Sequence, residues 1–185
     1  MKRDTHELFK VPMWHLSDNK LPKGIYEWCY NYPKTHPSVE TAKSNRGGYQ
    51  SMPTHNFDEF EYKSYIIAVL RFLPKFTLQN WWVNVNGKGD FNMAHTHSGS
   101  DLSLVWYLTD NNNSFRILNP QHHVRNNINR AFSGYASYGF NYELVKPVDC
   151  KEGDIIIFPS DLEHYVEPHE LRKERVTVSL NLKFN

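Results

Sequence analysis

The strongest constraint on the fold is a segment near the C-terminus in which apolar and polar residues alternate strictly. Its apolar positions are Val176, Val178, Leu180, Leu182 and Phe184. The positions between them are polar: Arg175, Thr177, Ser179, Asn181 and Lys183. Because successive side chains of a strand point to opposite faces, this pattern predicts a long β-strand with one apolar face and one polar face.

The polar face of this strand has two possible environments. Such a face normally turns to water. In a barrel that encloses a ligand, it can instead line the cavity while helices cover the apolar face. Two helices are predicted nearer the N-terminus, over residues 22–32, which start with a proline, and over residues 57–72, where apolar residues recur at roughly helical spacing. These helices could supply the cover.

Short strands separated by turns are predicted along the rest of the chain. They lie at 81–87, 102–108, 114–118 and 153–158, with an N-terminal edge strand at 8–14 that contains a proline. A long polar and aromatic insertion separates two of them, at 121–142. Aromatic residues make up 15% of the chain, which also favours β-structure.

These elements predict a mainly β fold in which two sheets form a jelly roll with an N-terminal helical cap. The length of 185 residues fits a single domain, 1–185, with a sizeable core. We expect residues 1–75 to form the N-terminal strand and helical cap. Residues 76–185 then form the β core.

Three histidines form a candidate metal site. His95 and His97 are two positions apart, so on a strand their side chains point to the same face. His164 follows the strand predicted at 153–158 and can close the third side. Imidazole suits iron, zinc, copper and nickel, and three ligands on one side of the ion leave the other side open. Open positions are what a substrate-binding or oxygen-activating metal needs.

The third ligand has an alternative. The usual non-haem iron site has two histidines and one carboxylate, but the position two after His95 holds His97. The acids nearest in sequence are Asp101, Asp161 and Glu163. Asp101 lies in the turn expected after His97, and Glu163 would alternate away from His164 on an extended segment. We therefore favour three histidines over a carboxylate ligand.

Arg175 and Thr177 share the polar face of the C-terminal strand. A guanidinium is a planar fork of donors that matches a carboxylate, and a hydroxyl can add one more hydrogen bond. Together these two side chains can bind the far carboxylate of a dicarboxylate whose other end chelates the metal.

Charge and composition give little indication of a macromolecular partner. The chain has 21 Lys and Arg against 20 Asp and Glu, a net charge of +1, which does not favour nucleic acid or an anionic membrane. It has no apolar run of bilayer length, and its polar N-terminus lacks a signal-peptide core. Cys29 and Cys150 form no motif, which favours free thiols in a reducing compartment. We expect a cytoplasmic protein.

Four motifs in a fixed order carry a family resemblance. The chain reads His-Thr-His-Ser-Gly-Ser-Asp-Leu from 95, Glu-Gly-Asp-Ile-Ile-Ile-Phe-Pro-Ser from 152, His-Tyr-Val-Glu-Pro from 164 and Glu-Arg-Val-Thr-Val-Ser-Leu-Asn from 174. Over residues 82–184 it resembles the superfamily of 2-oxoglutarate and Fe(II)-dependent oxygenases. Within that superfamily it is most similar to a branch of small oxygenases of marine bacteria and their phages, and more remotely to prolyl hydroxylases.

The resemblance implies a double-stranded β-helix core, Fe(II) as cofactor, and 2-oxoglutarate and O₂ as cosubstrates. His95 matches the first ligand position, His97 the position usually held by an acid, and His164 the distal histidine. No catalytic residue beyond these ligands is implied. A third imidazole in place of a carboxylate leaves the site one unit more positive, which alters the metal preference.

The resemblance also implies residues that bind 2-oxoglutarate. Arg175 matches the basic residue that pairs with the C5 carboxylate, and Thr177 takes the place of the hydroxyl that often assists it. Tyr107 matches a tyrosine that bonds the same carboxylate in prolyl hydroxylases. Asn84, on the strand before the ligands, is a further candidate.

The expected activity is hydroxylation of an unidentified substrate, with succinate and CO₂ as products; a protein side chain such as proline is one candidate. Two alternatives follow from the third histidine. The chain could be a cupin-like dioxygenase that uses no 2-oxoglutarate, with Arg175 holding the carboxylate of its own substrate. It could also be a non-catalytic jelly-roll binding module whose histidines hold zinc or nothing.

Overall fold

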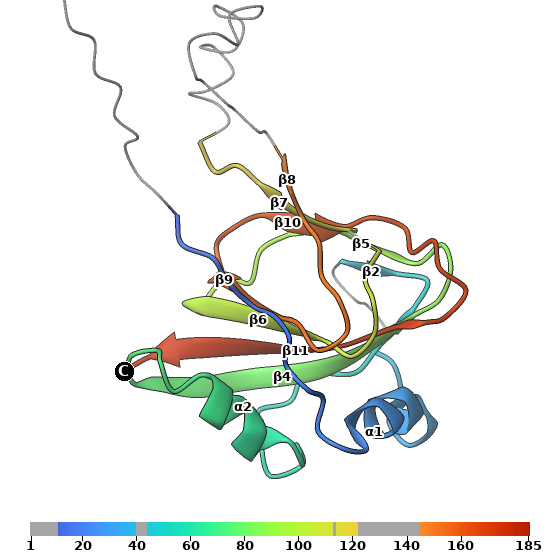
Figure 1. Ribbon diagram of the computed structural model, residues 1–185, viewed down its shortest axis with the longest axis horizontal. Helices are drawn as coiled ribbons and strands as arrows, with labels where there is room; N and C mark the ends of the chain where they lie inside the picture. The colour runs from blue at the N-terminus through green and yellow to red at the C-terminus, as the bar shows by residue number, and fades with distance from the viewer. Residues whose placement is uncertain (1–10, 40–43, 113, 122–144) are drawn as a thin grey trace, which may run out of the picture.

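Two antiparallel sheets lie face to face in the computed structural model, which describes residues 11–39, 44–112, 114–121 and 145–185 (Figure 1). The helices are α1 (Ile25–Asn31), η1 (Tyr32–Lys34) and α2 (Lys63–Val69). The strands are β1 (Trp14–Leu16), β2 (Asn45–Arg46), β3 (Tyr49–Gln50), β4 (Phe76–Asn86), β5 (Phe91–His95), β6 (Leu102–Tyr107), β7 (Phe115–Leu118), β8 (Val145–Val148), β9 (Ile155–Pro159), β10 (His164–Val166) and β11 (Arg175–Phe184).

The larger sheet has six strands in the order β1-β9-β6-β11-β4-β3, and the smaller has five in the order β2-β5-β10-β7-β8. Neighbouring strands pair antiparallel throughout both sheets. Strands that are consecutive in the chain, such as β9 and β10, fall in different sheets, as in a jelly roll. The predicted mainly β jelly roll is therefore confirmed.

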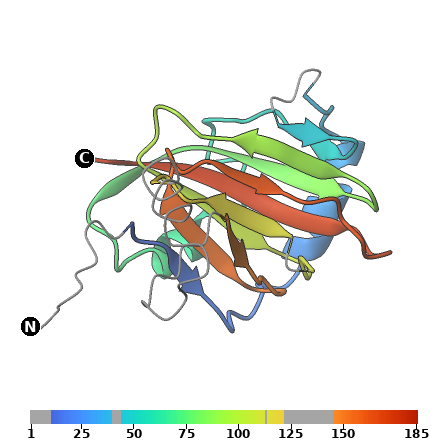
Figure 2. The same cartoon turned by 90° about the horizontal axis from the view of Figure 1, so that it is seen from above.

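Strand β11 lies between β4 and β6 (Figure 2), and its first eight residues are buried. Its apolar residues, such as Val178 and Leu180, join the main hydrophobic cluster. Its polar residues, Thr177 and Asn181 among them, are buried on the opposite side and line a cavity between the sheets. The strict alternation thus reflects a strand whose polar face meets an internal cavity and not bulk water.

The two helices lie on the outer face of the larger sheet (Figure 1). Ile25 and Cys29 of α1 and Ile66 of α2 are fully buried and belong to the same hydrophobic cluster as β11. Removing an isoleucine side chain from water stabilises the fold by roughly 1.5–3 kcal/mol. Among the described residues no helix is long and apolar enough to cross a membrane.

Helix α2 is shorter than the helix predicted over 57–72. Its N-terminal side consists of successive turns, in which Phe60 N–H bonds to Phe57 O and Lys63 N–H bonds to Phe60 O. These bonds span three residues and not four, so they close turns without starting an α-helix. Apolar spacing was therefore a correct guide to the buried face and a poor guide to the helix ends.

The edge strand lies later in the chain than predicted. Strand β1 pairs with β9 at the edge of the larger sheet and begins at Trp14, two residues after Pro12. Residues 8–10 of the predicted strand, and the insertion after residue 121, lie outside the described residues. Strands β2, β3, β5, β8 and β10 were not predicted as separate elements.

Candidate metal centre

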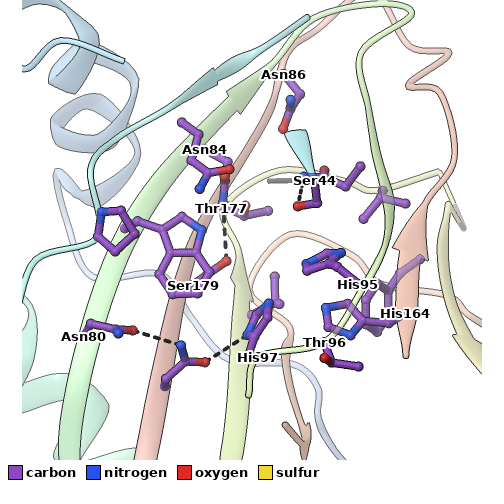
Figure 3. Close-up of a pocket in the computed structure, with 18 of the residues that line it drawn as sticks. Ser44, Asn80, Asn84, Asn86, His95, Thr96, His97, His164, Thr177 and Ser179 are labelled. Atoms are coloured by element: carbon purple, nitrogen blue, oxygen red, sulfur yellow. Dashed lines mark hydrogen bonds between the residues drawn. The ribbon is translucent and has the colours of Figure 1, made fainter. Parts of the chain in front are cut away.

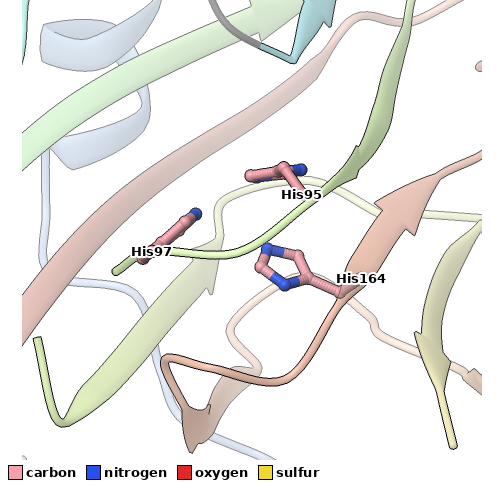
Figure 4. A group of neighbouring side chains, drawn as sticks. All are labelled: His95, His97 and His164. Carbon is pink, nitrogen blue, oxygen red and sulfur yellow. The ribbon is translucent and has the colours of Figure 1, made fainter. Parts of the chain in front are cut away.

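Three histidine rings lie next to one another (Figure 4). His95 ends β5 and His164 begins β10, and these two residues are direct partners in the antiparallel pairing. Their ring centroids are 4.3 Å apart, and each is 5.0 Å from the ring of His97. One potential ligand atom from each ring lies within 4.8 Å of the others. A single metal ion can be held by atoms at this separation.

His97 does not lie on a strand, so the two-residue spacing does not by itself place its ring on the same face as His95. Strand β5 ends at His95, and His97 is two residues beyond, in the segment that leads to β6. Its backbone N–H donates to Ser160 O at 2.9 Å, which fixes the segment next to the end of β9. This hydrogen bond takes the place of strand pairing, so the His97 ring still lies on the same side as the other two rings.

The outer ring nitrogens of His95 and His164 are bound to backbone carbonyls. Nδ1 of His95 is 2.7 Å from Met93 O, and Nδ1 of His164 is 2.8 Å from Leu162 O. A carbonyl oxygen only accepts, so in each ring Nδ1 carries the proton and Nε2 has the free lone pair. That tautomer is the one in which Nε2 can bind a metal.

Burial lowers the pKa of all three histidines. The pKa of His97 falls to about 4, mainly through burial and further through the charge of His95 beside it. The pKa of His164 lies well below its usual range for the same two kinds of reason, and that of His95 is also lowered by burial. At neutral pH the rings are therefore uncharged, which is the form that binds metal ions.

No carboxylate of the described residues joins the three histidines. Asp101 is instead bound by Lys183 Nζ and by the backbone N–H of Phe184, both at 2.8 Å. Asp161 and Glu163 are exposed. The geometry thus favours the three-histidine group over the alternative with an acid.

The cavity next to the histidines has a volume of about 390 Å³ (Figure 3). All seven residues singled out in the sequence line it: His95, His97, His164, Arg175, Thr177, Tyr107 and Asn84. Of the other described side chains that line it, none is an acid or a lysine. The structure therefore places the histidines and a buried guanidinium in one polar cavity.

Arg175 is 2% exposed and lacks a carboxylate partner among the described residues. Its Nη1 donates to Ser114 Oγ at 3.3 Å, whereas its Nη2 is buried without an acceptor. Burial lowers its pKa, although the nearby Tyr107 and Asp90 oppose this effect. A buried donor without a partner is costly, so this end of the cavity is suited to an anionic ligand.

Asn111 is a cavity residue that the sequence did not reveal. It is 0% exposed, and its Nδ2 has no acceptor. Ser114 connects it to Arg175, since Ser114 Oγ donates to Asn111 Oδ1 at 2.7 Å and accepts from the guanidinium. In the sequence Asn111 stands in a run of turn-forming residues, where asparagine is common for local reasons. The run gave no signal that one of its side chains points inward.

Asn84 and Tyr107 surround Thr177 on the polar side of the larger sheet. Asn84 Nδ2 donates to Thr177 Oγ1 at 3.2 Å, so the threonine hydroxyl keeps its own hydrogen for another acceptor. Tyr107 is the direct strand partner of Thr177. Its pKa is raised well above the usual range by burial, and it remains a neutral donor.

Residues 80–181, more than half of the chain, match a family model described as "Putative 2OG-Fe(II) oxygenase". No match was found among curated proteins.

Several solved structures share the fold. HygX from Streptomyces hygroscopicus, with nickel, 2-oxoglutarate and hygromycin B bound, is 12% identical with a TM-score of 0.61, and the match covers 95% of this chain and 84% of that one. A prolyl hydroxylase from Trichoplax adhaerens, in complex with a peptide fragment of the hypoxia-inducible factor, is 14% identical with a TM-score of 0.63, over 92% and 83%. A prolyl-4-hydroxylase from Pseudomonas putida is 14% identical with a TM-score of 0.57, over 95% and 94%.

Proposed function

Because the chain belongs to the family of putative 2OG-Fe(II) oxygenases, we propose that His95, His97 and His164 hold its Fe(II) and that Arg175 anchors its 2-oxoglutarate. One observation carries this proposal: three neutral imidazoles line the same cavity as a buried guanidinium that has no carboxylate partner in the described part of the chain. The first group suits a divalent metal ion, and the second suits the far end of a dicarboxylate.

The histidines fit Fe(II) in charge and in tautomer. Each ring is uncharged at neutral pH, and the Nδ1 atoms are engaged outside the site, so three Nε2 lone pairs remain. When bound, the iron with 2-oxoglutarate and O₂ supplies the oxidising chemistry that hydroxylates a C–H bond and yields succinate and CO₂. The protein's own task is to place the reactants and to limit access of water.

The part of the cavity around Arg175 fits the C5 carboxylate of 2-oxoglutarate. Arg175 supplies charge and two-pronged geometry, and Nδ2 of Asn111 supplies a neutral donor beside it. Thr177 and Tyr107 can each donate a hydroxyl hydrogen. Asn84 acts through Thr177. It donates to the Thr177 oxygen, so the hydroxyl hydrogen of Thr177 stays free for the carboxylate.

Aromatic side chains support the histidine end. The rings of Phe158 and Phe115 pack against His164, with centroid distances of 4.7 and 5.7 Å. Trp82 meets His97 edge to face at 5.4 Å. These contacts hold the imidazoles in fixed directions and reduce the room for water beside the metal.

The primary substrate is proposed by likeness alone: a protein side chain such as proline, as in the prolyl hydroxylases whose fold the chain shares. A second candidate function rests on one specific observation, the presence of His97 where an acid is usual. That position favours a three-histidine dioxygenase without 2-oxoglutarate, in which Arg175 would hold the carboxylate of the substrate. A binding module without catalysis is the third possibility.

We also propose that the protein acts in the cytoplasm. Cys29 and Cys150 are both free and buried. Burial raises the pKa of the Cys150 thiol to about 12, so it is unreactive. Two unpaired cysteines are compatible with a reducing compartment.

The test is an anaerobic titration of the Fe(II)-loaded protein with 2-oxoglutarate, followed by the visible charge-transfer absorption of the chelate. We expect a saturable band in the wild type and a strongly weakened response in Arg175→Ala. Arg116→Ala is the matched control, because Arg116 pairs with Glu167 and does not line the cavity. Bound iron without a band would favour the dioxygenase that uses no 2-oxoglutarate, and failure to bind iron would favour the inert module.

A further inference from the structure

His97 is held by a network of buried side chains. Its Nδ1 is 2.9 Å from Asn181 Oδ1 and 2.8 Å from Ser103 Oγ. Ser103 Oγ donates to the same Asn181 Oδ1 at 2.8 Å and is 2.9 Å from Ser160 Oγ. Asn181 Nδ2 in turn donates to Asn80 Oδ1 at 2.9 Å (Figure 3). Four strands or strand ends thus contribute to the position of one imidazole.

This support differs from that of the other two histidines. His95 and His164 are bound through backbone carbonyls two residues before each of them, and a substitution cannot remove those carbonyls. His97 alone depends on side chains, and it also lacks the strand geometry that aims His95. The orientation of the His97 ring therefore depends on side chains that can be substituted.

We propose that Asn181 is the positioning residue for His97, which it holds with Nδ1 protonated and Nε2 directed to the metal. The proposal rests on the function proposed above. The amide of Asn181 is fixed by its donation to Asn80, so its oxygen faces His97 as an acceptor. An acceptor at Nδ1 selects the tautomer with a free Nε2.

The network is neutral as well as specific. It consists of serine hydroxyls and asparagine amides, and no acid of the described residues takes part in it. Asn181 therefore orients the third ligand without returning the negative charge that a carboxylate ligand would bring. Substitutions at Asn181 can separate the orientation of His97 from the charge beside it. Aspartate keeps an acceptor for His97 and adds charge, although it gives up the donation to Asn80, whereas leucine removes the acceptor at similar size.

The test measures Co(II) affinity by competition with a chelator, together with the visible absorption spectrum of bound Co(II), in the absence of 2-oxoglutarate. We expect Asn181→Leu to bind Co(II) roughly 10- to 100-fold more weakly, with an altered spectrum, as is typical when an outer partner of a metal-binding histidine is lost. Asn181→Asp should bind at least as tightly as the wild type. Ser179→Ala is the control and should leave affinity unchanged, because Ser179 lies on the same face of β11 but, among the described residues, accepts from Asn84 and takes no part in the network around His97.

Testing Asn181→Leu also in the His97→Asp variant distinguishes the positioning of His97 from a general effect on the fold. In His97→Asp the side chain has no N–H for Asn181 to accept, so adding Asn181→Leu should cost no further affinity. The proposal is overturned if Asn181→Leu lowers Co(II) affinity by the same factor in the wild type and in His97→Asp. It is also overturned if Asn181→Leu binds Co(II) with wild-type affinity, or if Asn181→Leu and Asn181→Asp bind it equally weakly. If Asn181→Leu does not fold, Asn181→Ala replaces it in both backgrounds. A wild type that binds no Co(II) would instead contradict the proposed metal centre itself.

Discussion

His164 lies directly opposite His95 in the antiparallel pairing of β10 with β5. In an antiparallel pair, directly opposed residues point to the same side of the sheet. The register of two short strands therefore brings together two residues that are far apart in the chain. A slip of one residue in this register would turn one ring out of the cavity.

The first prediction concerns His164. His164→Ala removes one of three ligands, and we expect the affinity for Fe(II) or Co(II) to fall by more than the roughly 10- to 100-fold that the loss of an outer partner costs. Metal content after equilibrium dialysis measures the effect. His55→Ala, an exposed histidine outside the cavity, is the control. Iron retained at full stoichiometry in His164→Ala would disprove the assigned centre.

The second prediction concerns the shape of the charged group at position 175. Arg175→Lys keeps a positive charge but loses the planar fork, so we expect weaker binding of 2-oxoglutarate than in the wild type and stronger binding than in Arg175→Ala. Loss of one partner of a buried charged pair costs about 2–5 kcal/mol, which sets the range for the alanine variant. Calorimetric titration of the metal-loaded protein gives the three affinities. Equal affinities would show that the carboxylate binds elsewhere.

The third prediction concerns Asn111. Its buried Nδ2 has no acceptor, so a bound carboxylate would gain a hydrogen bond there. Asn111→Ala should weaken 2-oxoglutarate by about 1 kcal/mol, the typical net value of one hydrogen bond. The same titration measures this loss, and Co(II) affinity should stay unchanged as an internal control. Unchanged affinity for 2-oxoglutarate would assign the residue to the fold alone.

The fourth prediction concerns pH. The metal-free protein keeps its three histidines neutral because burial lowers each pKa, that of His97 to about 4. Between about pH 6.5 and pH 4 the unfolded chain binds protons that the folded chain does not, so stability falls as the pH falls. Each such proton contributes about 1.4 kcal/mol per pH unit.

Urea unfolding of the metal-free protein at a series of pH values measures this slope. His97→Asn should reduce the slope, because it removes one of the three groups. A stability that stays constant from pH 7 to pH 5, values chosen around the ordinary histidine pKa of about 6.5, would contradict the burial of neutral rings.

The fifth prediction concerns the apolar face of β11. Leu180 is fully buried in the main hydrophobic cluster, so Leu180→Ala should cost about 2–5 kcal/mol of the free energy of unfolding. Lys183→Ala, near the exposed end of the same strand, should change stability much less. Denaturant unfolding of both variants checks this contrast.

The sequence predicted those parts of the fold that depend on long, regular patterns. The alternation in β11 gave both the strand and the division of its faces, because a period of two repeated over ten residues matches a strand and does not match a helix. Helix α2 was overextended because the same apolar spacing can be produced by turns followed by a short helix. The pattern of apolar residues indicates which side chains are buried, but it does not indicate which backbone hydrogen bonds end a helix.

The candidate site was predictable only in part. His95, His97 and His164 could be grouped among ten histidines because of the two-residue spacing of the first pair and the position of the third directly after a predicted strand, and the polar face of the C-terminal strand added Arg175 and Thr177. Asn111 and Asn181 could not be found in this way, because asparagine is frequent in turns and on polar faces. Their importance depends on which atoms they meet across the cavity, and that arises from the pairing of distant strands.

The two faces of β11 have a practical consequence for changing what this protein does. Odd-numbered positions from 175 to 181 face the cavity, and even-numbered positions from 176 to 182 face the core under the helices. Substitutions at the odd positions are therefore expected to change the binding of metal or cosubstrate, whereas substitutions at the even positions are expected to change stability. On this strand the parity of the residue number separates the two kinds of effect.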